Sequence, residues 1–187
     1  MLHKPLQTLG ADLRALRKAR DLTLADLAGQ LGRSVGWLSQ VERDLSEPAI
    51  SDLRDLANVL DVPMSFLARH QPASRDEEGF IVRAGTRRPI GSRVSGLVEE
   101  LLSPDLTDDF EVVHSTFEPG ARSEPCIQRP TQEVGYLVSG QLDLTINGKT
   151  HVICPGDSFR IRGEAHSWSN PYPTPAVAIW VIAPPVY

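Results

Sequence analysis

The chain has 187 residues, 41% of them hydrophobic, and a formal net charge of −5, which suits one or two domains with packed cores. No apolar run approaches the ~20 residues needed to cross a bilayer, so we expect no membrane partner. Met1–Pro5 lacks the apolar core of a secretion signal and the two cysteines form no framework of spacings, so we expect a reduced, cytoplasmic protein.

The segment between Thr23 and Arg43 predicts two short helices joined by a tight turn. Thr23 and Ser34 are good N-cap residues, because a side-chain oxygen can accept from the free backbone N–H groups of a first helical turn. Gly32 tolerates the positive φ that a short interhelical turn requires. The core-facing positions recur at helical spacing: Leu24, Leu27, Ala28, Leu31, Leu38 and Val41. Together these features indicate a helix-turn-helix motif.

The outer face of the second helix carries short, polar or basic side chains, which can reach base edges and phosphates from the major groove of double-stranded DNA. The candidate DNA-binding residues are Ser34, Val35, Gly36, Trp37, Ser39, Gln40 and Arg43. Trp37 is equally compatible with packing against a neighbouring helix. Although the whole chain is acidic, residues 1–43 hold seven Lys and Arg against four Asp and Glu, a balance that is compatible with binding DNA.

Residues 8–67 resemble the XRE family of helix-turn-helix domains, the type found in the lambda and 434 repressors. The matching positions are Leu16-Arg17, Leu22-Thr23-Leu24, Leu27-Ala28, Gly32, Ser34, Leu38-Ser39, Val41-Glu42-Arg43 and Pro48. The resemblance implies five helices, with a recognition helix over Ser34–Glu42 and a partly buried ion pair between Arg17 and Glu42. Because one recognition helix covers only half of an operator, we expect a homodimer.

The region that follows the motif predicts the end of the first domain. A helix is predicted at about Ala49–Leu60, and Pro63 can open a short final helix through Leu67. Residues 70–79 contain few apolar side chains and are interpreted as a linker. This places a DNA-binding domain at residues 1–69 and a second domain at residues 80–187.

Residues 80–187 predict an all-β domain, because apolar and polar residues alternate in short runs separated by Gly and Pro. The predicted strands are Phe80–Val82, Gly96–Leu102, Phe110–Phe117, Val134–Val138, Gln141–Ile146, His151–Ile153, Ser158–Ile161 and Val177–Ile182. Asp108, Asp109 and Glu111 are interpreted as a hydrated loop edge. The fold class is therefore α + β over two domains, all-α first and an all-β sandwich or barrel second.

Two segments of the second domain resemble the two cupin motifs. Gly120, Cys126, Gln128, Glu133 and Gly140 have the spacing of the first motif. The second motif is matched by Pro155-Gly156-Asp157, His166 and Asn170. The resemblance implies a jelly-roll-like cupin barrel with an internal pocket for a small molecule. The predicted effector-pocket residues are Cys126, Gln128, Glu133, Tyr136 and His166.

The first cupin motif departs from the pattern of metal-binding cupins, which place histidines where Cys126 and Gln128 stand. An amide oxygen is a poor ligand for zinc or ferrous iron. Cys126, Glu133 and His166 could still hold a divalent metal with one open position. We favour a pocket for a small polar metabolite, anchored by Glu133 and His166, with no cofactor required.

The joined architecture resembles bacterial transcriptional regulators that fuse a repressor-type helix-turn-helix to a cupin sensor, among them the putrescine-utilisation repressor. The segments Glu133–Gly140 and Leu144–Gly148 carry this closer similarity. The resemblance implies a repressor that binds a DNA operator and an amine-bearing effector. The alternative is a metal-dependent cupin enzyme with an accessory helix-turn-helix domain. The departures at Cys126 and Gln128 argue against it, since that chemistry needs an intact metal triad.

Overall fold

The computed structural model describes residues 8–67, 76–77, 79–90, 94–104, 106, 108–124 and 126–186. Its contacts divide the chain into two compact units. The first comprises residues 1–90 and 103–108 with Tyr187, and the second comprises residues 91–102 and 109–186. Most of the predicted linker at residues 70–79 lies outside the described residues.

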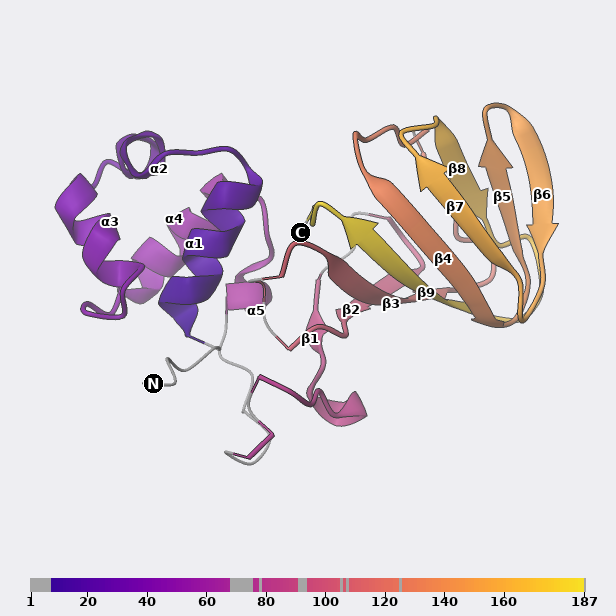
Figure 1. The fold of residues 1–187 in the computed structure, drawn as a ribbon, viewed down its shortest axis with the longest axis horizontal. Coiled ribbons are helices and arrows are strands. Elements are labelled where there is room, and N and C mark those ends of the chain that lie inside the picture. Colours follow the sequence, from indigo (N-terminus) through magenta and orange to yellow (C-terminus); the bar gives the residue numbers. More distant parts are fainter. Residues whose placement is uncertain are drawn as a thin grey trace. The chain divides into compact units, whose positions relative to one another are not determined.

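The first unit is helical, as Figure 1 shows. Its helices are α1 (Leu9–Ala19), α2 (Leu24–Gln30), α3 (Val35–Val41), α4 (Ile50–Val59) and the single turn α5 (Met64–Leu67), followed by the 3₁₀ turn η1 (Ala84–Thr86). None of the described helices is long and apolar enough to cross a membrane.

The helix boundaries follow from the capping residues that the sequence predicts. The Thr23 side chain accepts from the Asp26 N–H, while Asp26 accepts from the Thr23 N–H, so α2 begins with a reciprocal capping box. Ser34 accepts from the Trp37 N–H at the start of α3. Gly32 lies between the two helices with φ +63°. The predicted helix-turn-helix geometry is therefore present.

A largely apolar core fixes these helices against one another. Its buried side chains are Leu13, Leu16, Leu27, Ala28, Leu38, Val41, Leu56, Ala57, Leu60, Phe66 and Leu67. Helix α1 approaches the end of α3 very closely, because a Cβ atom on Gly10 would lie 2.5 Å from the Val41 carbonyl oxygen. Leu24 and Leu31, predicted as core residues, are only half-buried.

A buried ion pair crosses the same contact. The Arg17 Nε donates to Glu42 Oε1 at 2.6 Å and a second guanidinium nitrogen donates to Glu42 Oε2 at 3.0 Å. Arg17 and Glu42 are 8% and 5% exposed. Arg17 also donates to the Leu22 carbonyl at 2.7 Å, so one side chain holds α1, the turn before α2 and the end of α3. The predicted pairing of Arg17 with Glu42 is confirmed.

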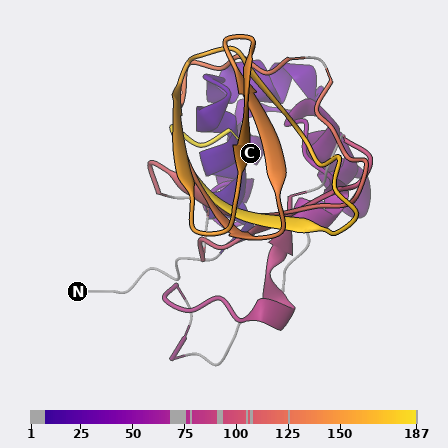
Figure 2. The ribbon, with the colours of Figure 1, turned by 90° about the vertical axis from the view of Figure 1, so that its right-hand side faces the viewer.

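The second unit is an antiparallel β-structure of two sheets that face each other, and Figure 2 views it end-on. Its strands are β2 (Leu97–Leu101), β3 (Glu111–Phe117), β4 (Gln132–Ser139), β5 (Leu142–Ile146), β6 (Lys149–Ile153), β7 (Ser158–Arg162), β8 (His166–Ser169) and β9 (Ala176–Ala183), whereas the short β1 (Arg88–Pro89) belongs to the first unit. The larger sheet runs β2-β3-β9-β4-β7 and the smaller one β6-β5-β8. The predicted α + β class is confirmed.

Alternation along each strand separates an inner face from an outer face. On β4, Glu133, Gly135 and Leu137 are buried while their neighbours are exposed. The Phe159 ring lies where a Cβ atom of Gly135 would be, 2.1 Å from that position, so only glycine fits beneath it. Aromatic rings fill the interior, with Phe117 and Trp168 in edge contact at 4.6 Å between ring centres.

One predicted strand is absent from the described residues. Phe80–Val82 forms no strand, and Phe80 and Ile81 are 72% and 44% exposed. This short apolar run has no neighbouring strand to pair with among the described residues. Apolar composition alone does not make a strand without such a partner.

We expect Glu42→Gln to lower the free energy of unfolding of the helical unit by about 3–5 kcal/mol, because it leaves the Arg17 charge buried without its partner. Urea denaturation followed by far-ultraviolet circular dichroism measures this loss. The matched control is Glu47→Gln, which removes a carboxylate from an exposed loop position and should change stability by less than about 0.5 kcal/mol. Equal stabilities for the two variants would contradict the role given to the ion pair.

Candidate functional site

The predicted recognition helix α3 presents an open outer face. Ser34, Val35, Gly36, Gln40 and Arg43 are exposed, and Val35 is the most exposed apolar side chain of the helix at 47%. Leu38 and Val41 on the opposite face are buried. The Arg43 side chain folds back and donates to the Ser39 carbonyl at 3.0 Å, which leaves its charge at the helix end. Helix α3 is thus anchored in the core by its buried face, and most of its candidate DNA-binding side chains are exposed to solvent.

Trp37 differs from its neighbours on α3, because it is half-buried. The Arg33 guanidinium lies 5.3 Å from the centre of the Trp37 ring, at the distance of a cation–π contact. Arg33 also pairs with Asp52 of α4. Trp37 therefore takes part in packing within the helical unit, the second of the two roles that the sequence left open, and Ser39 is likewise half-buried.

In the β-unit, Glu133 and His166 are both 3% exposed and come from the two different sheets. Glu133 Oε1 accepts from the Thr131 hydroxyl at 2.6 Å. The His166 Nδ1 lies 3.2 Å from the Glu164 carbonyl oxygen. Of the predicted pocket residues, these two are the ones buried in the interior.

The other predicted pocket residues lie elsewhere. Cys126 and Gln128 are exposed, and each is engaged with backbone: Cys126 Sγ donates to the His166 carbonyl at 3.1 Å and Gln128 Nε2 to the Gly163 carbonyl at 3.2 Å. Tyr136 is 48% exposed on the outer face of β4. Its assignment to the pocket is wrong, because Tyr136 is an odd number of residues from Glu133 and side chains alternate along a strand.

The structure does not assemble a metal site from the candidates Cys126, Glu133 and His166. Within the described ranges, no three His, Cys, Asp or Glu side chains gather closely enough to hold a metal ion. The exposed thiol is turned to a backbone carbonyl and the buried carboxylate to a hydroxyl. This donor set does not fit the metal that the cupin resemblance allows.

Two further carboxylates lie on the inward face of the larger sheet, of which Glu111 is buried and Glu99 is half-buried. Glu111 is 2% exposed, and its Oε1 accepts from the Val186 N–H at 3.3 Å. Its Oε2 has no hydrogen-bond partner among the described residues. Glu99 Oε1 accepts from the Ser115 hydroxyl at 3.2 Å. The interpretation of Glu111 as part of a hydrated loop edge is wrong, because it shares the inward face of β3 with Val113, Ser115 and Phe117.

These carboxylates interact electrostatically. Burial raises the pKa of Glu111 from 4.5 to about 7; the Val186 hydrogen bond opposes the rise, and the charges of Glu99 and Glu133 add to it. Burial also raises the pKa of Glu99. The nearby Arg129 guanidinium lowers the pKa of both Glu99 and Glu111. The inner wall of the β-unit is therefore acidic, and the exposed Arg129 acts on it electrostatically.

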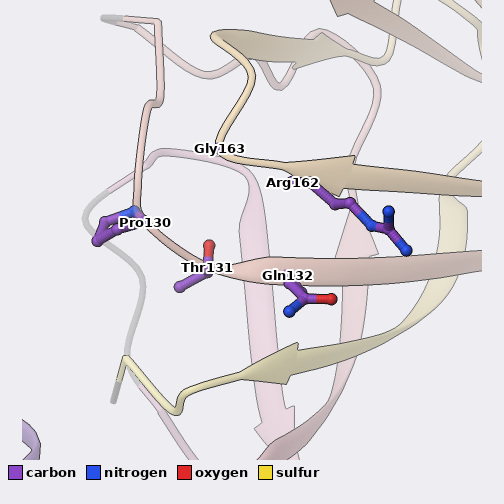
Figure 3. Close-up of a pocket in the computed structure, with 5 residues that line it drawn as sticks. All are labelled: Pro130, Thr131, Gln132, Arg162 and Gly163. Carbon is purple, nitrogen blue, oxygen red and sulfur yellow. The ribbon is translucent and has the colours of Figure 1, made fainter.

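An open depression adjoins this wall. It has a volume of about 480 Å³ and is lined by Pro130, Thr131, Gln132, Arg162 and Gly163. Figure 3 shows Pro130 and Thr131 on the segment that leads into β4, with Arg162 and Gly163 at the end of β7. Thr131 joins the depression to the interior, because its hydroxyl contacts the buried Glu133.

We expect the stability of the β-unit to fall as the pH rises from about 4.5 to about 7 and then to level off. Over this pH range Glu111 stays protonated in the folded state but loses its proton in the unfolded chain. Raising the pH therefore stabilises the unfolded state relative to the folded one. The cost is up to roughly 3 kcal/mol for a pKa shift of this size. Glu111→Gln removes the titrating group and should be more stable than the parent at pH 8.

This expectation is checked by urea denaturation at several pH values, followed by tryptophan fluorescence, since Trp168 and Trp180 are buried in the β-unit. The matched control is Glu118→Gln, which removes an exposed carboxylate next to the end of β3. A parent and a Glu111→Gln variant with parallel pH profiles would show that Glu111 titrates normally.

Comparison with known proteins supports the same division of the chain. Residues 8–68 match the helix-turn-helix domain family and residues 113–182 match the cupin domain family. The HTH-type transcriptional regulator PuuR of Escherichia coli is 28% identical over 163 residues, which cover 86% of each chain. The HTH-type transcriptional regulator SutR of the same organism is 28% identical over 166 residues, covering 87% of this chain and 86% of SutR.

Among solved structures, an RmlC-like cupin from Shewanella frigidimarina superposes with a TM-score of 0.50 at 19% identity, covering 63% of this chain and 96% of that one. At this identity the likeness concerns the fold alone. The helix-turn-helix match lies in the helical unit and the cupin match lies in the β-unit. The alignments with PuuR and SutR extend over both. The chain therefore joins an XRE-type helix-turn-helix domain to a C-terminal cupin domain and is homologous over most of its length to HTH-type transcriptional regulators.

Proposed function

We propose that this regulator is a repressor that binds a two-fold operator as a homodimer, and that a small amine bound in its cupin domain changes its hold on DNA. The DNA-binding part of this proposal rests on the outer face of α3, which is exposed while the opposite face of the helix is buried. Glu133, buried inside the β-unit, carries the effector part. We propose a regulator and not a metal-dependent enzyme, since the described residues do not bring together the donor set of a metal-dependent cupin.

The chemistry of α3 suggests how an operator is read. Gln40 is an exposed amide that can pair bidentately with an adenine edge in the major groove. Val35 is exposed at the start of the helix and suits contact with a thymine methyl group. Arg43 lies just beyond the helix end, where a positive charge suits a phosphate.

We expect Gln40→Ala to weaken operator binding by about 1–3 kcal/mol through the loss of contact with one base. Arg43→Ala should weaken binding to all DNA sequences alike and reduce the slope of log affinity against log salt concentration by about one. Fluorescence anisotropy with operator, singly substituted and scrambled duplexes at several salt concentrations separates the two effects. Asn58→Ala, which removes an exposed amide from α4, is the control and should bind as the parent does. Gln40→Ala would not be a base-reading change if operator and scrambled DNA lost equal affinity.

The dimer is proposed to form through the outer face of the larger sheet. Val98, Val134, Tyr136, Val138 and Val181 are exposed there by 40–52%. Val134 on β4 lies directly beside Val181 on β9, so their side chains form a continuous apolar surface. A surface of this kind on a protein that reads two half-sites suits a symmetric contact with a second copy.

We expect Val134→Lys to shift the full-length protein towards monomer and to weaken operator binding, because each interface would bury the new charge twice. Analytical ultracentrifugation across micromolar concentrations measures the first effect. Val152→Lys places the same charge on a 54% exposed position of β6 in the other sheet and should leave the dimer intact. A Val134→Lys variant that sediments as the parent does would locate the dimer contact elsewhere.

The effector is proposed to be a small polar molecule with an amino group. A buried carboxylate such as Glu133 is costly without a partner, and an ammonium group would supply both a charge and hydrogen-bond donors. We expect Glu133→Gln to abolish the effector response of operator binding while the effector-free variant keeps its operator affinity. Anisotropy titrations with and without added amine test this, and metal analysis of the purified protein tests the enzyme alternative. A full response in Glu133→Gln would rule out this role for Glu133.

A further inference from the structure

The chain returns to the helical unit after the predicted linker. Helix α5 ends at Leu67, yet the first unit extends to Ile90 and includes η1 and β1. Strand β1 lies next to α5 (Figure 1). The helical unit therefore includes a segment, residues 84–90, that lies between the predicted linker and the strands of the β-unit. We call this segment the strap.

Arg88 attaches the strap to two helices. Its Nη2 donates to Asp12 Oδ2 on α1 at 2.7 Å, and its guanidinium carbon lies 5.1 Å from the centre of the Phe66 ring on α5. The Arg88 and Asp12 side chains are 13% and 8% exposed, and Phe66 is 1% exposed. Because water is largely excluded, the ion pair and the cation–π contact hold the strap more firmly than the same contacts on an open surface would.

The residues before the strap make contacts among themselves. The N–H groups of Phe80 and Ile81 donate to the Glu77 carbonyl at 3.0 and 2.9 Å. The Arg83 guanidinium pairs with the Glu77 carboxylate. These contacts stay within residues 77–83, so they do not tie the segment to a helix, whereas the Arg88 contacts do.

The strap shortens the connection between the two units. If the strap were detached, residues 68–90 would join α5 to the β-unit, and a flexible chain of that length has a root-mean-square span of about 26 Å. With Arg88 docked, the chain leaves the helical unit at Ile90, and β2 begins at Leu97. The connection is then residues 91–96 alone.

The length of this connection matters for a dimer that reads two half-sites. Such half-sites lie about 34 Å apart on one face of the DNA. A long flexible connection lets each helical unit reach half-sites over a range of spacings, because it fixes neither the distance nor the orientation of the second unit. A short connection accepts fewer spacings.

We propose that Arg88 is a positioning residue for DNA recognition: by docking on Asp12 and Phe66, it keeps the connection short and restricts the half-site spacing that the dimer accepts. This inference rests on the proposed homodimer on a two-fold operator. Arg88 acts here without touching DNA. Its partner Asp12 lies on α1, the helix whose Arg17 holds the end of α3 through Glu42, so the strap is docked on the helix that supports the recognition helix.

The test is fluorescence anisotropy with a duplex that the full-length parent selects from a randomised pool, and with the same duplex after insertion of about five base pairs between its half-sites. The insertion turns one half-site to the opposite face of the DNA. We expect the parent to lose affinity by about 100-fold, since bivalent attachment is worth about 10²- to 10⁴-fold. The double variant Asp12→Asn with Arg88→Met should lose less than about 10-fold, because its longer connection still reaches both half-sites.

The double variant is chosen so that the helical unit still folds. It replaces the ion pair by neutral side chains and leaves no charge buried alone. Circular dichroism checks the fold. Arg83→Met is the matched control, because it removes a charge from an exposed position just before the strap and should follow the parent on both duplexes. Arg88→Lys keeps a cation beside Asp12 and should retain the spacing preference in part.

Hydrogen exchange measures the strap without DNA. The amides of residues 84–88 should exchange at least about 10-fold faster in the double variant than in the parent, because a detached segment is open to solvent. Unchanged exchange would show that Arg88 does not hold the strap and would overturn the proposal. Faster exchange with the spacing preference of the parent would overturn the spacing role and leave the dimer standing. A parent that sediments as a monomer and binds a single half-site would refute the homodimer, and the spacing role with it.

Discussion

The ion pair between Arg17 and Glu42 is the constraint on which the DNA-binding half depends. Glu42 is the residue that ends α3, and Arg17 lies in α1, so the pair fixes the recognition helix to the helix that supports it from behind. Gly10 lets the two backbones come close enough for this contact, and Arg17 adds a bond to the Leu22 carbonyl before α2. A buried pair of this kind stabilises little by itself but penalises every arrangement that separates the charges. It therefore specifies one geometry for the outer face of α3.

In the β-unit the corresponding constraint is strand register. A shift of one residue would exchange the inner and outer faces of a strand, carrying Glu133 into solvent and Tyr136 into the interior. Gly135 beneath the Phe159 ring resists such a shift, because a larger residue at that position would collide with the ring. The same register that buries the aromatic core therefore also buries Glu111 and Glu133, so the acidic interior and the apolar outer face are two consequences of one pairing pattern.

The sequence predicted what depends on local rules and missed what depends on strand pairing. The Thr23 and Ser34 caps and the helical spacing of Leu27, Leu38 and Val41 are local, and they gave the helix-turn-helix correctly. Tyr136 and Glu111 were misplaced for a related reason. Tyr136 is assigned to the pocket because it lies within the first cupin motif, although it is three residues from Glu133 and therefore on the opposite face of β4. Glu111 is grouped with two acidic loop residues, although it is the first of the alternate inward-facing positions that continue with Val113, Ser115 and Phe117. Counting alternate positions along each strand from a known buried residue assigns both side chains to the correct face.

The exposed positions of Cys126 and Gln128 separate the first cupin motif from the acidic inner wall of the β-unit. The segment that supplies the first ligands in metal cupins is here turned to backbone carbonyls, whereas Glu99 and Glu111 come from strands that precede that segment. The buried Glu111, whose Oε2 has no hydrogen-bond partner among the described residues, lowers the stability of the β-unit. A ligand that bound only the folded β-unit would raise its stability by mass action, by about 2.7 kcal/mol at a hundredfold excess over the dissociation constant. The amine effector proposed above would in this way convert its concentration into stability of the cupin domain, and that stability is a quantity that a regulator can couple to its affinity for DNA.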